Sequence, residues 1–320
     1  MKTTWSAVCA IASLLASAAL VLSSSASEFP ERAVEITVTF PPGGTPDVLA
    51  RALSEGMSAE LKQPFVVLNK LGAAGMVGAT AVSRAKPDGH SLLFAPALVQ
   101  SVAPLINVNP DYKPDGLVPI CQAFETQMAL VVKPDSPYKT VGDIIDAARA
   151  KPGVVTYGHA GIGSIPQLAM IELANAAKVE FNAIPYKGDA DVPGPVLGGI
   201  IDFGPMTLSA VPVGAVRIVA IFADKRNPGL PDTPTVREQG FNVAPTSFGG
   251  LFAPAGVPEG IKATLEKSCK SAKAQPHYLA TAKRILLGTN LYADASAFGE
   301  RLAKDISEKK ELLKSLGYPK

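Results

Sequence analysis

Two hydrophobic periods alternate along this chain. In VEITVTF, apolar residues occupy every second position, so Val34, Ile36, Val38 and Phe40 share one face, which predicts a strand. A Pro/Gly turn follows, and residues 45–57 then show the period of an amphipathic helix. The same alternation continues to the end of the chain, which is typical of an α/β fold with mostly parallel strands.

The remaining elements follow from the same pattern. Further strands are expected at residues 65–68, 92–95, 127–133, 181–185, 200–203 and 217–222. Further helices are expected at about 76–86, within 140–153, after 164, and at 258–274 and 294–316. Extended segments near 125–133 and 247–254 are expected to cross twice between two lobes, one formed by residues 27–127 and 250–320 and the other by residues 128–249.

The junction after the first predicted strand has the features of an anion site. Thr45 stands at the expected N-cap, Pro46 at the first helical position and Asp47 in the first turn. Gly43 and Gly44 would let a ligand approach the free N–H groups at the positive end of the helix. The alternative interpretation is that the glycines only permit a tight turn.

A second junction later in the chain repeats this plan. The strand VVTYGHA ends at His159 and Ala160, Gly161 and Gly163 follow, and Ser164 is the predicted N-cap. Two such loops predict two lobes that grip one small anion between them.

The first 26 residues have the pattern of a secretory signal peptide. Lys2 precedes an apolar stretch over residues 7–22, and Ser24 and Ala26 have the spacing of a cleavage site. The apolar stretch is too short for a membrane span. We therefore expect cleavage after Ala26 and a soluble, periplasmic mature chain.

Charge and cysteine content limit the partners and cofactors that we expect for this chain. The formal net charge is +2 for 320 residues, without a basic patch that contains interleaved aromatics, so nucleic acid is not an expected partner. Cys121 and Cys269 remain after processing; export would allow them to pair, but we favour two buried free thiols. Because CxxC, HExxH and GxGxxG are missing from the sequence, we expect no metal and no cofactor.

Seven segments occur in a characteristic order over nearly the whole mature chain. They are FPERAVEITVTFPPGGTPDVLAR, LGAAGMVGA, KPDGHSLLF, KPGVVTYGHAGIGS, IPYKG, LPDTPTVREQGF and GLFAPAGVPEGI. With them the chain resembles the substrate-binding receptors of tripartite tricarboxylate transporters, the Bug or TctC-like family. The resemblance implies a two-lobed periplasmic-binding-protein fold (type II-like) that closes on a small organic carboxylate, without catalysis, and delivers it to membrane transporter subunits.

The resemblance also implies which residues bind the ligand. They are Phe40, Gly43, Gly44, Thr45 and Asp47 in the first loop, and His159, Ala160, Gly161, Gly163 and Ser164 in the second. Apart from the resemblance, we expect Met206, Pro205, Pro96 and Ala97 to form an apolar wall around the rest of the ligand. We expect Asp47 to orient its loop, since its charge would repel an anion. A protonated His159 would attract one, although a lone histidine is more often packed. The apolar wall favours a carboxylate or dicarboxylate with an apolar or aromatic body.

The sequence departs from the family pattern at several points. His159-Ala160, Gln167-Leu168 and Pro205-Met206 replace more usual residues, and Pro193 and Pro195 interrupt a usual helix. Two other functions remain as alternatives: a ligand-sensing partner of a membrane sensor, and an exported hydrolase. The loops contain glycines, hydroxyls and one histidine and there is no GxSxG motif, so hydrolysis has little support. We expect a monomer.

Overall fold

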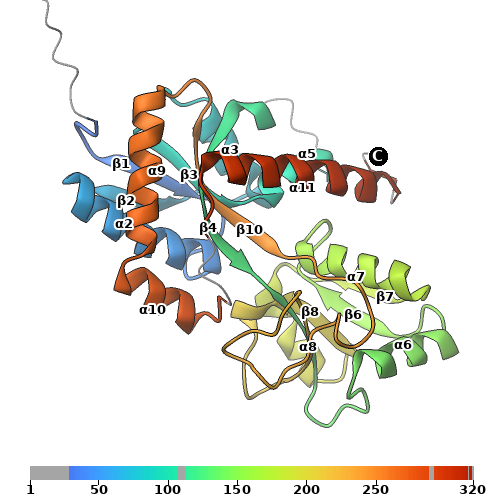
Figure 1. Cartoon of the computed structure of the whole chain (residues 1–320). Coiled ribbons are helices and arrows are strands. Elements are labelled where there is room, and N and C mark those ends of the chain that lie inside the picture. Colours follow the sequence, from blue (N-terminus) through green and yellow to red (C-terminus); the bar gives the residue numbers. More distant parts are fainter. Residues whose placement is uncertain (1–28, 107–111, 288–291, 316, 319–320) are drawn as a thin grey trace, which may run out of the picture.

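The protein has two lobes, each built on a five-stranded sheet (Figure 1). The structure is a computed structural model that describes residues 29–106, 112–287, 292–315 and 317–318. The predicted signal peptide at residues 1–26 lies outside this part of the chain. None of the described helices is long and apolar enough to cross a membrane.

Lobe 1 contains the sheet β2-β1-β3-β10-β4. Its strands are β1 (Val34–Val38), β2 (Phe65–Asn69), β3 (Ser91–Pro96), β4 (Leu117–Thr126) and β10 (Ser247–Pro254). Its helices are α2 (Thr45–Leu61), α3 (Met76–Ser83), α4 (Leu98–Ser101), α5 (Ala103–Ile106), α9 (Glu259–Lys273) and α10 (Pro276–Arg284), with short 3₁₀ turns η1 (Ala73–Gly75) and η2 (Pro114–Gly116). Strand β1 runs parallel to β2 and β3, whereas β10 is antiparallel to β3 and β4.

Lobe 2 contains the sheet β7-β6-β8-β5-β9. Its strands are β5 (Met128–Val132), β6 (Thr156–His159), β7 (Asn182–Pro185), β8 (Phe203–Thr207) and β9 (Arg217–Phe222). Its helices are α6 (Val141–Ala150), α7 (Ile165–Ala177) and α8 (Pro193–Leu197), with 3₁₀ turns η3 (Asp189–Asp191) and η4 (Leu208–Ala210). Strand β6 is parallel to β7 and β8, and β5 is antiparallel to β8 and β9.

The two sheets follow one plan, and the predicted two-lobed α/β fold is confirmed. Both sheets are mixed rather than mostly parallel, and the path of the chain gives the reason. The chain leaves lobe 1 through β4, passes Gln127 and enters lobe 2 as β5. It returns through residues 223–246 and enters lobe 1 as β10, beside β4 (Figure 1). Strands β5 and β10 therefore start at the interlobe boundary, where the parallel strands of their sheets end.

Helix α11 (Ala295–Ser315) packs on both lobes (Figure 1). Phe298 and Leu302 are buried in a lobe 1 cluster, whereas Leu313 is buried in the core of lobe 2. The Lys309 Nζ donates to Glu172 Oε1 on α7 at 2.9 Å. The assignment of residues 250–320 to lobe 1 alone, made from the sequence, does not account for these contacts, and the predicted lobe boundaries stay a proposal.

A disulfide joins Cys121 on β4 to Cys269 on α9, with the two Cα atoms 6.6 Å apart. Our preference for two free thiols was therefore wrong. The pair is separated by 148 residues and meets only because α9 returns to lie against β4. Both residues belong to the buried core between the sheet and helices α2 and α9.

One predicted strand is displaced. We expected it at residues 200–203, but β8 spans Phe203–Thr207. Ile200 is 74% exposed, and Asp202 Oδ2 accepts a hydrogen bond from Thr156 N at 2.7 Å, so this segment forms the turn before the strand. The strand itself contains Gly204 and Pro205, two residues that a strand pattern normally excludes.

Candidate functional site

The loops that follow the parallel strands meet at the boundary between the lobes. Thr45, after β1, and Ser209, after β8, place their hydroxyl oxygens 2.5 Å apart across this boundary. Gly163, after β6, packs against Val102 and Ile106, which follow β3. The carboxyl ends of four parallel strands from two lobes thus converge, and this is where ligands bind in open α/β sheets.

Both glycine loops use the same hydrogen bond. Gly43 N donates to Asp47 Oδ2 at 2.9 Å, and Gly163 N donates to Gln167 Oε1 at 2.7 Å. Each glycine has a positive φ, 80° and 75°, which favours glycine. In both loops the side chain of the third helical residue therefore closes the turn on the glycine four residues earlier.

The helix starts differ in their caps. Ser164 is the N-cap of α7, as predicted, and its Oγ accepts from Gln167 N at 3.4 Å. In lobe 1 the N-cap is Gly44, and Thr45 is already the first helical residue, so the prediction of Thr45 as N-cap was wrong. Pro46 fits the second position equally well, because the first N–H groups of a helix have no intrahelical acceptor. The hydroxyl of Thr45 is therefore free for its contact with lobe 2.

The buried carboxylate of Asp47 is held entirely by groups of its own lobe. It accepts from Gly43 N, from Arg51 at 2.9 and 3.1 Å, and from Asn69 Nδ2 at 2.9 Å. Burial raises the pKa of Asp47, but the hydrogen bonds from Arg51, Gly43 and Asn69 outweigh it and hold this pKa below its ordinary value. This geometry favours the orienting role over direct ligand contact.

His159 is buried beneath the second loop. Its Nδ1 lies 2.9 Å from the carbonyl oxygen of Gly161, so Nδ1 carries the proton and donates it. Burial lowers the pKa of His159, and the bond to Gly161 opposes this shift only in part. A neutral imidazole that supports the loop fits these contacts better than the cation considered from the sequence.

The predicted apolar wall is mostly enclosed. Pro96 and Ala97 are buried at the end of β3, and Met206 has no exposed surface because it packs with Val192 and Val196 inside lobe 2. The predicted contact between Met206 and a ligand has no support in this placement. Phe40, Ala160 and Gly161 are each partly exposed at their loops.

Residues that the sequence did not assign to the binding site also lie at this boundary. Asn69 Nδ2 donates to Phe40 O as well as to Asp47, and Ser209 and Gln167 make the contacts described above. Asp189 Oδ2 accepts from Thr207 N at 3.1 Å, beside the second loop. The sequence pattern placed this strand at 200–203 instead of Phe203–Thr207. Thr207 and Ser209 were therefore not recognised as residues at the carboxyl end of a strand, where ligand-binding residues are expected.

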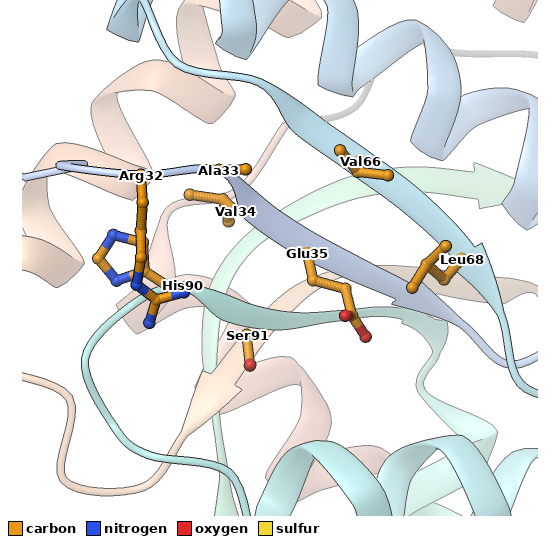
Figure 2. A pocket seen from close by; sticks show the side chains of 8 residues that line it. All are labelled: Arg32, Ala33, Val34, Glu35, Val66, Leu68, His90 and Ser91. Atoms are coloured by element: carbon orange, nitrogen blue, oxygen red, sulfur yellow. The ribbon is translucent and has the colours of Figure 1, made fainter.

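Two surface hollows lie elsewhere. One, of about 320 Å³, is lined by the starts of β1 and β3 and by Val66 and Leu68 of β2 (Figure 2). It is at the opposite end of these strands from the loops. The other, of about 550 Å³, lies between α6 and α7. Neither is lined by a predicted ligand-binding residue. Within the described residues, no group of three or more His, Cys, Asp or Glu side chains is placed to hold a metal ion.

The model of the tripartite tricarboxylate transporter family receptor matches residues 49–317. The chain belongs to this family. The resemblance inferred from the sequence is thus confirmed. A relative from Cupriavidus necator, the UPF0065 protein in the gbd 5' region, is 30% identical over 320 residues, covering 98% of this chain and 96% of that protein.

Solved structures of similar proteins extend this match to the whole fold. The structure of R. palustris Rpa4515 with adipate has a TM-score of 0.81 at 25% identity, covering 91% of this chain and 99% of that chain. The periplasmic binding protein BugD has a TM-score of 0.77 at 31% identity, covering 90% and 99%. MatC from Rhodopseudomonas palustris with bound malate has a TM-score of 0.75 at 28% identity, covering 89% and 99%.

Proposed function

We propose that this protein is a periplasmic solute receptor of the tripartite tricarboxylate transporter family. It binds one small organic carboxylate between its lobes, without chemical conversion, and delivers it as a monomer to the membrane subunits of such a transporter. The observation that carries this proposal is the pair of matched glycine loops at one interlobe boundary. The adipate and malate in similar structures support a carboxylate ligand.

The chemistry of the boundary suits this role. The first turns of α2 and α7 present N–H groups without intrahelical acceptors, and helix N-termini favour anions. The Oγ of Ser164 accepts from the backbone, and its own proton remains available to a ligand. The charged groups of the first loop, Asp47 and Arg51, neutralise each other. Neutral donors therefore recognise the carboxylate, with closure of the lobes excluding water.

Calorimetry tests this proposal directly. The mature protein is titrated with adipate, malate, benzoate and further carboxylates, with adipamide as the uncharged control for adipate. We expect 1:1 saturable binding of at least one acid, no binding of the matched amide, and recovery of the acid unchanged by mass spectrometry. Recovery of a converted product, or equal binding of acid and amide, would contradict a carboxylate receptor.

A further inference from the structure

One carboxyl group at the interlobe boundary has no role in the site described so far. Asp189 opens the turn η3, just after β7, and its Oδ2 accepts from Thr207 N at the end of β8. Thr207 stands two residues before Ser209, whose hydroxyl touches Thr45 of the other lobe. Asp189 therefore belongs to the same carboxyl-end edge of lobe 2 as the second glycine loop.

The sheet order places Asp189 next to that loop. Strand β6 lies between β7 and β8, and neighbouring strands are about 4.8 Å apart, so a chain that leaves β7 must cross the end of β6 to reach β8. Tyr186 N donates to His159 O at 2.8 Å at the start of this crossing, and the Asp189–Thr207 bond completes it. The side chain of Asp189 thus lies at the carboxyl end of β8, the strand next to β6 and its glycine loop.

The second oxygen of this carboxyl is unsatisfied. Oδ1 of Asp189 is shielded from solvent and has no hydrogen-bond partner among the described residues. Asp47, at the other loop, has four donors. Burial raises the pKa of Asp189, and the hydrogen bonds from Thr207 offset this shift only in part. A buried acceptor without a partner is costly, and such a group in a binding cleft calls for a ligand donor.

We propose that Asp189 is a specificity-determining residue whose Oδ1 accepts a hydrogen bond from a donor group on the bound carboxylate. The ligand class is then an organic acid that also carries a hydroxyl or ammonium group, rather than the acid with a purely apolar body favoured by the sequence. This inference rests on the proposed function. An acid without a donor would leave Oδ1 unpaired.

Matched acids test the inference. Succinate, malate and aspartate share one four-carbon chain and differ in a single substituent, and adipate and 2-aminoadipate form a longer pair. Calorimetry of the wild-type protein should show that the donor-bearing member of a pair binds at least about tenfold more tightly than the plain acid, as expected for a hydrogen bond to a charged group. Equal affinities within each pair that binds would overturn the inference.

Two variants and a control separate recognition from structure. Asp189→Ala should abolish the preference within a pair and change the affinity for the plain acid little, while Asp189→Asn, which keeps an oxygen acceptor, should retain part of it. The exposed neighbour Asp191→Ala should leave the preference intact. Melting temperatures of all variants report whether each one folds.

The outcomes also separate this inference from the proposed function. If Asp189→Ala weakens every acid by the same factor, Asp189 only supports Thr207 and the inference fails. If carboxylates bind without any preference for a donor group, the proposed receptor function is supported and the role assigned to Asp189 is wrong. If no carboxylate binds at all, both fall.

Discussion

The first and second glycine loops reach the same geometry with different side chains. In the first, Asp47 takes the glycine N–H and is itself held by Arg51 and Asn69. In the second, the neutral Gln167 takes the equivalent N–H. What both loops require is one acceptor four residues after a glycine with positive φ, and the charge of that acceptor is not essential.

The loops also differ in their surroundings. Gly43 is exposed, and a side-chain carbon there would meet nothing within 4 Å. Gly163 is buried, and a side-chain carbon there would lie 2.5 Å from Ile106 Cδ1 of lobe 1. The glycine of the second loop therefore packs against the opposite lobe, whereas the glycine of the first loop does not, and the first loop reaches lobe 2 through Thr45 instead.

The largest expected effect comes from removing the two acceptors. Asp47→Ala removes an acceptor shared by three donor groups, and we expect it to lower the free energy of unfolding by about 2–3 kcal/mol, since Arg51 is half exposed and regains water. Gln167→Ala leaves one N–H unpaired and should cost about 1 kcal/mol. Urea unfolding measures both, with the exposed Glu60→Ala as control. Equal losses would contradict the difference between the loops.

The next effect distinguishes the glycines. Alanine at either position must adopt a positive φ, which costs about 1–2 kcal/mol. Gly163→Ala should lower the free energy of unfolding by about 2 kcal/mol, more than Gly43→Ala does, because Ile106 must also shift. Small-angle scattering of the ligand-free variants should show a larger radius of gyration for Gly163→Ala only. A Gly43→Ala variant that opens equally would show that Gly163 is not an interlobe contact.

Hydroxyl removal has a smaller effect on stability. Ser164→Ala removes an N-cap and should lower stability by about 1 kcal/mol, whereas Thr45→Ala removes no cap, loses only the contact with Ser209 and should lower stability less. If both hydroxyls also donate to the carboxylate, each variant binds the ligand tenfold to a hundredfold more weakly. Melting curves and calorimetry on the same samples measure both. A drop in melting temperature with unchanged affinity for Ser164→Ala would limit that hydroxyl to capping.

The smallest expected effect is that of pH on the first loop. Because the pKa of Asp47 is below its ordinary value in the folded protein, its stabilisation is complete above about pH 5 and is lost as the pH falls through the folded pKa. As the pH falls from about 5 to well below 4, wild type should therefore lose more stability than Asp47→Asn, which cannot titrate. Gln167→Ala should follow the wild-type profile. Identical profiles for wild type and Asp47→Asn would show that Asp47 carries no shifted pKa.

Local patterns in the sequence were sufficient for the elements that depend on local chemistry. The strand at 217–222 and the cap at Ser164 were both predicted. Each depends on alternating side chains or on an acceptor within three residues of a helix start, and both are visible in a short window.

Contacts set by topology could not be predicted in this way. Ser209, Asp189 and the Cys121–Cys269 pair gain their partners only when strands from distant parts of the chain become neighbours. The offset of β8 has a local cause, because Gly204 and Pro205 obscure the strand pattern. The contact of α11 with lobe 2 was missed because its apolar face alone does not indicate which lobe it covers.

A crystal structure with the tightest-binding carboxylate tests the central claim most directly. We predict that the carboxylate oxygens lie within hydrogen-bond distance of first-turn N–H groups of both α2 and α7, between Thr45 and Ser164. A ligand bound to one lobe alone, or seated in the hollow beside β2 shown in Figure 2, would contradict the claim that the two loops together form the site.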